Sequence, residues 1–157
     1  LFVCENNGYA TESPLDVRQP EGFDFCKRAD AFGLRSKNID GNDVEQVYIE
    51  TSNAIEYIRN EKRPFFLECN TYRWLEHVGP YYDHELERTY RSIEELNTWK
   101  EQCPIKKYRE QLLTEGIIKE NDFFNMENRV KDEINSDIDR ALKAPWPNKD
   151  SLFDNTY

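Results

Sequence analysis

The amino-acid sequence predicts an α/β domain, a parallel sheet with flanking helices, followed by a helical C-terminal extension. Two observations lead to this prediction: apolar runs alternate with helical segments, and turn or capping residues separate them. The apolar runs are residues 1–4, 34–39 and 65–69, and the segments of helical periodicity are residues 23–32 and 44–58. Because parallel strands need crossover connections, which helices usually supply, this order favours a parallel sheet.

Capping and turn residues bound these elements in order. Asparagine and glycine within residues 5–8 favour a turn after the first strand. Gly33 fits the C-cap of the first helix, and Asn42 or Asp43 offers an N-cap for the second. Pro64 then stops the second helix before the third strand.

The chain changes character after a polar, aromatic loop at residues 75–90 and becomes helical. Ser92 opens a segment with capping-box spacing, and Pro104 fits the first turn of a further helix. We therefore predict two regions. Residues 1–90 belong to the α/β domain, and residues 91–157 form the helical extension and tail.

A long amphipathic helix is predicted within this extension. Asn121 or Asp122 is expected to start it, and Pro145 is expected to stop it. Its apolar residues recur on one face, at positions 123, 126, 130, 134, 138 and 142. The tail from residue 146 to residue 157 is expected to be extended.

Composition and charge limit the classes of function. With 31 acidic and 21 basic residues, the chain of 157 residues carries a formal net charge of −10. A field of this sign repels a phosphate backbone, which argues against nucleic-acid binding. No apolar run approaches the roughly 18–20 residues that a membrane-spanning helix needs, so we expect no membrane partner.

The four cysteines are scattered along the chain without C-x-x-C spacing, at positions 4, 26, 69 and 103. Two of them stand in apolar, strand-like runs, where a thiol usually behaves as a small core residue. We predict that all four are reduced and that the protein resides in the cytoplasm.

The first four residues form an apolar run that is typical of a buried strand. Neither a starting methionine nor a signal peptide precedes this run. We therefore expect that the chain has been cut from a longer one.

The motif Glu5-Asn6-Asn7-Gly8-Tyr9 has the residue types of a magnesium–diphosphate site. Magnesium neutralises diphosphate oxygens and prefers hard oxygen ligands in an octahedron. An asparagine side-chain carbonyl offers one such ligand without adding charge, and a backbone carbonyl two residues later offers another. The alternative is a tight turn whose asparagines adopt left-handed geometry. Tyr72-Arg73 follows another predicted strand end, so we expect the two segments to share one crevice.

These motifs resemble, in order and over nearly the whole chain, the alpha subunit of thiamine-diphosphate-dependent 2-oxo acid dehydrogenases. This family supplies the decarboxylating first component of pyruvate, branched-chain 2-oxo acid and acetoin dehydrogenase complexes. The resemblance implies the C-terminal half of such a subunit, with part of a thiamine-diphosphate-binding fold in residues 1–90. The segments that carry it are residues 3–9 (the closing half of the cofactor motif), 28–34, 39–44 ("V-D-G-N-D"), 64–73 ("G-P-x-L-x-E-x-x-T-Y-R"), 90–95, 104–105 and 152–154.

The resemblance also implies cofactors and site residues. The cofactors are thiamine diphosphate and Mg²⁺, with Asn7 as a metal ligand through its side chain and Tyr9 through its backbone carbonyl. His77 occupies the place of the histidine that follows "T-Y-R" and faces the diphosphate and the substrate channel. A histidine there donates to a phosphate oxygen or steadies negative charge on a decarboxylating substrate. The alternative for His77 is a surface side chain without a site role.

Three departures from the family pattern matter. Where the family has "H-G-H-S", this chain has Leu75-Glu76-His77-Val78, and Glu76 is expected to bring a carboxylate close to the diphosphate. Val78 replaces a serine that kinases phosphorylate in some relatives, so that modification is chemically impossible here. The opening "G-D-G" half of the cofactor motif would lie upstream of Leu1. The fragment alone is therefore expected to bind the cofactor weakly or not at all.

The activity that the resemblance implies is oxidative decarboxylation of a small 2-oxo acid, with acyl transfer to lipoyl. The implied partners are a beta subunit in an α2β2 heterotetramer and a lipoyl-bearing acyltransferase. The helical extension is expected to pack on a partner. One alternative is a degenerate, non-catalytic interaction module of the same fold. A dinucleotide-binding domain is disfavoured, because no G-x-G-x-x-G follows any predicted strand.

Overall fold

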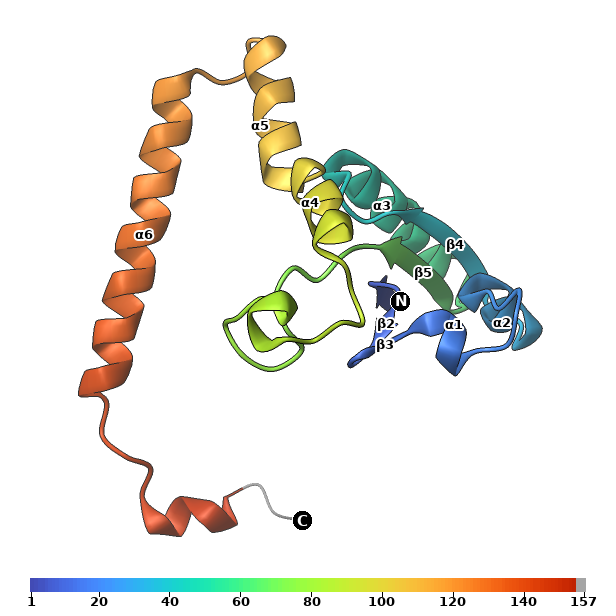
Figure 1. Cartoon of the computed structure of the whole chain (residues 1–157), viewed down its shortest axis with the longest axis horizontal. Coiled ribbons are helices and arrows are strands. Elements are labelled where there is room, and N and C mark those ends of the chain that lie inside the picture. Colours follow the sequence, from blue (N-terminus) through green and yellow to red (C-terminus); the bar gives the residue numbers. More distant parts are fainter. Residues whose placement is uncertain (155–157) are drawn as a thin grey trace. The chain divides into compact units, whose positions relative to one another are not determined.

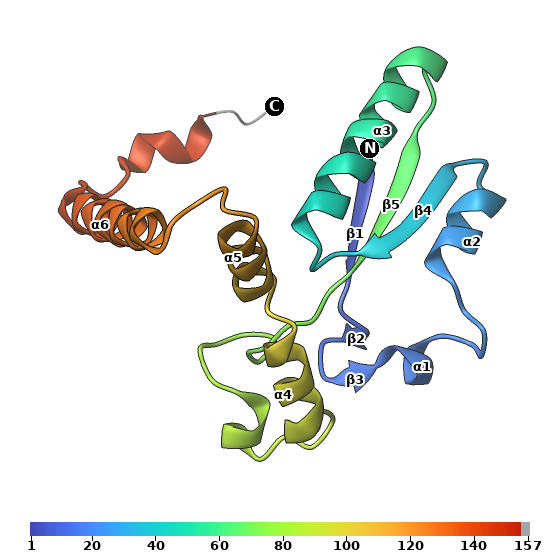
Figure 2. The same cartoon turned by 90° about the horizontal axis from the view of Figure 1, so that it is seen from above.

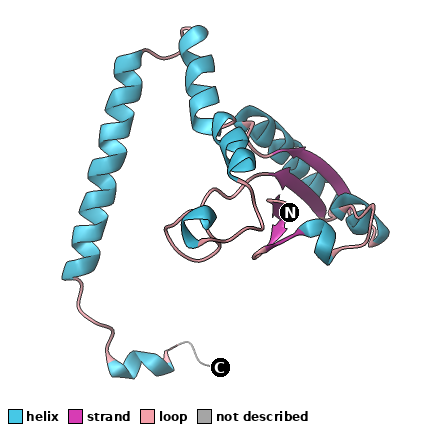
Figure 3. Cartoon of the chain, viewed as in Figure 1, coloured by secondary structure: helices cyan, strands magenta, loops and turns pink. Residues whose placement is uncertain are grey.

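The chain folds into two compact units in a computed structural model that describes residues 1–154 (Figure 1). The first unit is Leu1–Glu110, and the second begins at Gln111. Among the residues described, every strand belongs to the first unit (Figure 3). The predicted boundary at residue 90 stays a prediction, because compactness alone does not establish a domain that folds independently.

The first unit is built on a three-stranded parallel sheet, which confirms the predicted α/β class. Its strands are β1 (Phe2–Asn6), β5 (Phe65–Asn70) and β4 (Arg35–Asp40), in this order across the sheet (Figure 2). β5 is therefore central and pairs with a neighbour on each side. Two further strands, β2 (Tyr9–Ala10) and β3 (Ser13–Pro14), form a small antiparallel ribbon.

Helices α2 (Phe25–Ala31) and α3 (Val44–Glu61) lie in the two crossovers and pack on opposite faces of the sheet. Successive side chains of a strand point to opposite faces. Accordingly Leu67 of β5 packs in the core with α3, whereas its neighbour Glu68 contacts Cys26 of α2. The other helical segments of this unit are α1 (Leu15–Arg18), the 3-10 turn η1 (Asp83–Leu86), α4 (Ile93–Glu101) and α5 (Pro104–Thr114), which runs past residue 110.

Capping residues confirm the predicted boundaries of these helices. Asp43, one of the two predicted N-caps, accepts a hydrogen bond of 2.9 Å from the backbone N–H of Gln46 at the start of α3. Gly33 has a φ of +77° directly after α2, a left-handed conformation that glycine adopts without strain. Ser92 caps α4 as predicted, and Pro104 is the first residue of α5.

The hydrophobic core lies between β5 and α3. Phe65, Leu67 and Cys69 of β5 pack with Ile39 of β4 and Ala54 of α3. Leu67 is 1% exposed, and burial of a leucine side chain contributes about 1.5–3 kcal/mol. The central strand is thus fixed along its length, and with it the position of the residues that follow its carboxyl end.

The prediction that residues 1–4 form a buried strand is wrong in part. β1 does form, but Phe2 is 58% exposed and Val3 is 57% exposed. The physical reason is its place in the sheet. β1 is an edge strand that pairs with β5 on one side, and no other described strand pairs with its outer side.

The second unit contains α6 (Glu120–Lys143) and the 3-10 segment η2 (Lys149–Phe153). α6 begins at Glu120, one residue before Asn121 and two before Asp122, the predicted starts, and Lys119 is its N-cap position. The Asp122 carboxylate reaches back to accept from the backbone N–H of Lys119 at 2.9 Å. The tail is not wholly extended, since η2 is helical, and residues 155–157 lie outside the described part of the chain.

The apolar face predicted for α6 is present, but apart from the half-buried Phe123 its side chains are exposed in the described structure, including Ile134 and Ile138 at 52% each. No helix in residues 1–154 combines the length and the apolar character that crossing a bilayer requires.

Candidate functional site

The three parallel strands end together at one edge of the sheet. Asn6 of β1 and Asp40 of β4 are both in register with Asn70 of β5. This edge is polar: Asn70 Nδ2 donates to Asn38 Oδ1 at 2.6 Å, and Asn6 Nδ2 donates to Glu68 Oε1 at 2.7 Å. Ligands of open α/β sheets bind beyond the carboxyl ends of the strands, so this edge is the expected place for a site.

A pocket of about 490 Å³ opens at this edge. The turn after β1, the segment after β5 and α4 all contribute to its wall, through residues that include Asn6, Asn7, Tyr9, Tyr72, Glu95 and Trp99. The predicted crevice is therefore confirmed for Asn6, Asn7 and Tyr72, whereas Arg73 does not line it. A larger hollow of about 850 Å³ is lined by residues of α6 alone, so it is the open side of one helix rather than a cleft between elements.

Two side-chain-capped turns shape the segment after β1. Asn6 Oδ1 accepts from the backbone N–H of Gly8 at 3.0 Å, and Asn7 Oδ1 accepts from the backbone N–H of Tyr9 at 3.0 Å. The chain reverses at Gly8, which has a φ of +76°, and neither asparagine has a positive φ. The segment is therefore a tight turn, as the alternative has it, but Gly8 rather than an asparagine adopts the left-handed conformation.

The Tyr9 side chain is held at the first turn of α4. Its hydroxyl lies 2.8 and 2.7 Å from the two carboxylate oxygens of Glu95 and donates to this carboxylate. Burial, and then the hydrogen bond and charge of Glu95, raise the pKa of the Tyr9 hydroxyl well above its usual range, so it stays protonated. Tyr72 packs against Tyr9 edge to face. Tyr72 also stacks on Trp99, with 5.2 Å between the centroids of the Tyr72 and Trp99 rings.

The donor atoms of this turn fit magnesium. Asn7 Oδ1 accepts one hydrogen bond, and an amide oxygen has a second lone pair that can coordinate a cation. The Tyr9 hydroxyl is committed to Glu95, so Tyr9 would contribute its backbone carbonyl, as the family resemblance implies. Two neutral oxygens leave the other positions of an octahedron to diphosphate, water and ligands from outside this chain.

Ion pairs with Arg88 hold the loop after β5. Arg88 Nη1 lies 3.1 Å from Glu76 Oε2 and 3.0 Å from Glu12 Oε1, and the Glu76 side chain is 4% exposed. Gly79 makes room for this carboxylate, because a Cβ atom there would clash with it. Glu76 is expected to bring a carboxylate close to the diphosphate, but here its carboxylate pairs with Arg88 inside the loop and does not line the pocket of Asn7 and Tyr9.

Arg91 joins the two ends of the same loop. Its Nε donates to Asp83 Oδ2 at 2.8 Å, and its guanidinium also donates to the backbone carbonyls of Arg73 and Leu75. The hydroxyl of Tyr90 donates to Asp83 at 2.7 Å. Burial alone would raise the pKa of Asp83, but the hydrogen bonds from Tyr90 and Arg91 outweigh it and lower the pKa below its ordinary value. The carboxylate therefore stays ionised.

His77 is the predicted site residue that the structure does not bring to the pocket. It lies exposed in the loop that Arg88 and Arg91 hold, and it is not among the residues that line the pocket of Asn7 and Tyr9. Its role at the diphosphate or the substrate stays a prediction.

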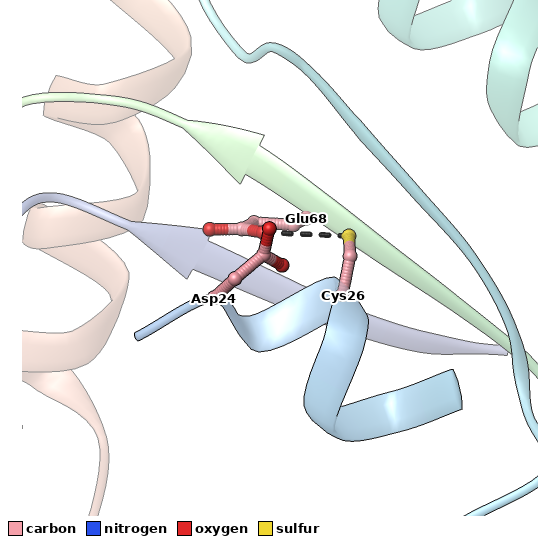
Figure 4. A group of neighbouring side chains, drawn as sticks. All are labelled: Asp24, Cys26 and Glu68. Atoms are coloured by element: carbon pink, nitrogen blue, oxygen red, sulfur yellow. Dashed lines mark hydrogen bonds between the residues drawn. The ribbon is translucent and has the colours of Figure 1, made fainter. Parts of the chain in front are cut away.

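Sequence reasoning missed Glu68, a carboxylate in the central strand that is 4% exposed. It accepts from Asn6 Nδ2 at 2.7 Å and from the thiol of Cys26 at 3.4 Å (Figure 4). The available signal was a lone charged residue within the apolar run at residues 65–69. Glu95 was missed as well, because nothing in the sequence connects it with a tyrosine 86 residues away.

Asp24, Cys26 and Glu68 each place a ligand atom within 4.8 Å of the others, a spacing that a metal ion can use. Each group is already engaged. Asp24 caps α2 by accepting from the backbone N–H of Lys27 at 2.9 Å, and Cys26 donates to Glu68. Burial raises the pKa of Cys26 to about 11, with a further contribution from Glu68, so the thiol stays protonated. The three residues are therefore assigned to hydrogen bonding.

Comparison with known proteins identifies the family of the chain. Residues 1–150 match the family described as "Dehydrogenase E1 component". The chain is 32% identical to the human "2-oxoisovalerate dehydrogenase subunit alpha, mitochondrial", and 100% of it aligns with 34% of that protein. It is 30% identical to the "Pyruvate dehydrogenase E1 component subunit alpha" of Rickettsia bellii (strain RML369-C), again over all of this chain and 46% of the relative. The "2-oxoisovalerate dehydrogenase subunit alpha, mitochondrial" of Macaca fascicularis is also 32% identical, over all of this chain and 34% of the relative.

The chain thus spans between about a third and about half of the length of these relatives. The family match covers far more than half of the chain, and its relatives are named as alpha subunits. This chain belongs to the dehydrogenase E1 component family, among the alpha subunits of 2-oxo acid dehydrogenases.

Proposed function

We propose that this chain is part of a thiamine-diphosphate-dependent alpha subunit that decarboxylates a small 2-oxo acid oxidatively, with transfer of the acyl group to lipoyl. The observation that supports this most directly is the turn Asn6–Tyr9 at the carboxyl edge of the sheet, in a chain of this family. Relatives are named for 2-oxoisovalerate and pyruvate, both small 2-oxo acids.

In this proposal, Asn7 Oδ1 and the backbone carbonyl of Tyr9 hold Mg²⁺ against the diphosphate. Bound thiamine diphosphate supplies the carbanion chemistry of the reaction. The chain itself binds and orients. Glu95 holds the Tyr9 side chain through two short contacts with its hydroxyl. These contacts limit rotation of the Tyr9 backbone and therefore of its carbonyl. The rings of Tyr72 and Trp99 give the pocket an apolar wall that limits water.

The partners in this proposal are a beta subunit, in an α2β2 heterotetramer, and a lipoyl-bearing acyltransferase. Their support is membership of the family, whose relatives include a "component subunit alpha". A cytoplasmic location is proposed on the four free thiols, two of which are buried in the described structure.

Replacing Asn7 by alanine is expected to weaken magnesium-dependent binding of thiamine diphosphate by more than about tenfold, the loss that even an outer-shell partner of a metal causes. Isothermal titration of the complete alpha–beta assembly measures the effect. Asn38→Ala is the matched control, because it removes an asparagine from the same sheet edge outside the pocket. Wild-type affinity in Asn7→Ala would contradict the metal role. If the wild-type assembly binds no cofactor, the non-catalytic interaction module takes the place of the enzyme.

His77→Ala is expected to slow decarboxylation by roughly tenfold or more, since a group that transfers a proton or stabilises charge at the reacting atoms contributes about 10²–10⁴-fold. Single-turnover decarboxylation by the cofactor-saturated assembly measures this step apart from product release. The second histidine of the chain, His84, supplies the control, and His84→Ala should react at the wild-type rate. A smaller loss in His77→Ala would make His77 a surface side chain without a part in the reaction.

A further inference from the structure

We propose that Glu68 is a positioning residue for the cofactor turn. Acting through Asn6, it fixes the orientation in which Asn7 and Tyr9 present their oxygens to a magnesium-bound diphosphate. This inference rests on the proposed function and deepens it. It adds a residue that touches neither metal nor cofactor but sets the geometry of those that do.

The burial of Glu68 needs a reason. It stands in the central strand between Leu67 and Cys69, both core residues, and is itself 4% exposed. A buried carboxylate costs several kcal/mol unless hydrogen bonds or a counter-charge compensate it. No ion pair found among residues 1–154 includes Glu68, and its donors are the Asn6 amide and the Cys26 thiol. An acidic group kept in such a place indicates a task that an apolar residue cannot perform.

Asn6 connects that carboxylate to the turn. Its Nδ2 donates to Glu68 Oε1 at 2.7 Å, and its Oδ1 accepts from the backbone N–H of Gly8 at 3.0 Å. Both ends of one planar carboxamide are therefore held, which removes its freedom to rotate. Since Asn7 lies between Asn6 and Gly8, the two fixed points determine the direction in which Asn7 and the following carbonyl of Tyr9 face.

The second oxygen of Glu68 has an anchor of its own. Cys26, in the first turn of α2, donates its thiol to Glu68 Oε2 at 3.4 Å (Figure 4). The carboxylate is thus held from α2 on one side and holds Asn6 on the other. A hydrogen-bonded chain from Cys26 through Glu68 and Asn6 to Gly8 therefore connects α2 and the central strand with the turn.

A purely structural tie between β1 and β5 is the competing explanation. Such a tie would affect folding without a specific effect on the metal. The chain offers a matched comparison, because the Asn38–Asn70 pair joins β4 to β5 on the other side of the same strand, also through a side-chain amide, at 2.6 Å. Asn38 does not line the pocket or contact the turn.

The test uses the complete alpha–beta assembly and four variants: Glu68→Ala, Glu68→Gln, Asn6→Asp and Asn38→Ala. Isothermal titration gives the Kd for Mg²⁺ at a fixed concentration of thiamine diphosphate, and circular dichroism establishes that each variant is folded. Glu68→Ala and Asn6→Asp should each raise this Kd by about tenfold or more, as loss of an outer-shell partner does. Asn6→Asp keeps an oxygen that accepts from Gly8 but replaces the donor to Glu68 by a carboxylate oxygen, so it breaks the link and also sets a second negative charge beside Glu68.

Glu68→Gln should stay within about threefold of the wild type, because its side-chain carbonyl still accepts from Asn6 in a neutral hydrogen bond. Asn38→Ala should equal the wild type. Wild-type affinity in Glu68→Ala and Asn6→Asp, beside a clear loss in Asn7→Ala, would overturn the positioning role and leave the proposed function intact. Equal losses in Asn38→Ala would assign the effect to the sheet edge in general. If Glu68→Ala does not fold, Asn6→Asp decides the question, since it leaves Glu68 in place.

Discussion

Replacing Arg91 by methionine is expected to lower the free energy of unfolding by about 3–5 kcal/mol, the usual effect of leaving one partner of a buried ion pair uncompensated. The Arg91 side chain is 4% exposed and pairs with Asp83, whose side chain is 5% exposed. Its removal leaves the carboxylate with Arg88, whose Nη1 is 3.7 Å from the other oxygen and already pairs with Glu12 and Glu76. The carbonyls of Arg73 and Leu75 would lose their donor as well.

Urea-induced unfolding of the complete alpha subunit measures this loss. The control is Arg140→Met, because Arg140 pairs with Asp137 at 3.0 Å through side chains that are 80% and 64% exposed. Exposed ion pairs contribute about 0–1 kcal/mol, so the control should unfold close to the wild type. Similar losses in both variants would mean that burial of the Arg91 pair has no particular importance.

Replacing Leu67 by alanine is expected to cost about 2–5 kcal/mol of stability, because the removed methyl and methylene groups leave a cavity that the sheet cannot fill by collapsing. Leu67 is 1% exposed, on the central strand, and packs in the core with Ala54 and Phe65. The same urea experiment measures the effect. Leu142→Ala is the matched control, since Leu142 is 79% exposed and its truncation should change stability by no more than about 0.5 kcal/mol. A loss in Leu67→Ala no larger than this would show that the β5–α3 layer is not the main core.

The fold class and most element boundaries could be predicted because they depend on residues that are close in sequence. Periodicity and local capping determine where a helix begins and ends, as Asp43 and Gly33 illustrate. Exposure could not be predicted in the same way. The first strand has the apolar composition of a buried one, yet its burial depends on what pairs with its outer side, which residues 1–4 do not encode.

The candidate site was predictable for a similar reason and to a similar extent. Asn7 and Tyr9 belong to one short motif. Because parallel strands end at one edge of a sheet, Tyr72 could be predicted to lie in the same pocket. Glu68, Glu95 and the partners of Glu76 depend on contacts between residues distant in the chain. The carboxylate of Glu76 pairs with Arg88, and no local sequence pattern predicts this pair.

The stacking of Trp99 on Tyr72 gives the pocket an intrinsic optical signal. An indole ring changes its emission when its surroundings become less polar or when a stacked neighbour shifts, and Trp99 stands in the wall beside Asn7 and Tyr9. Trp146 is 94% exposed, so its emission should stay constant when the pocket is filled. Filling of the pocket should therefore be visible in the unlabelled protein as a change in fluorescence, followed continuously as ligand is added.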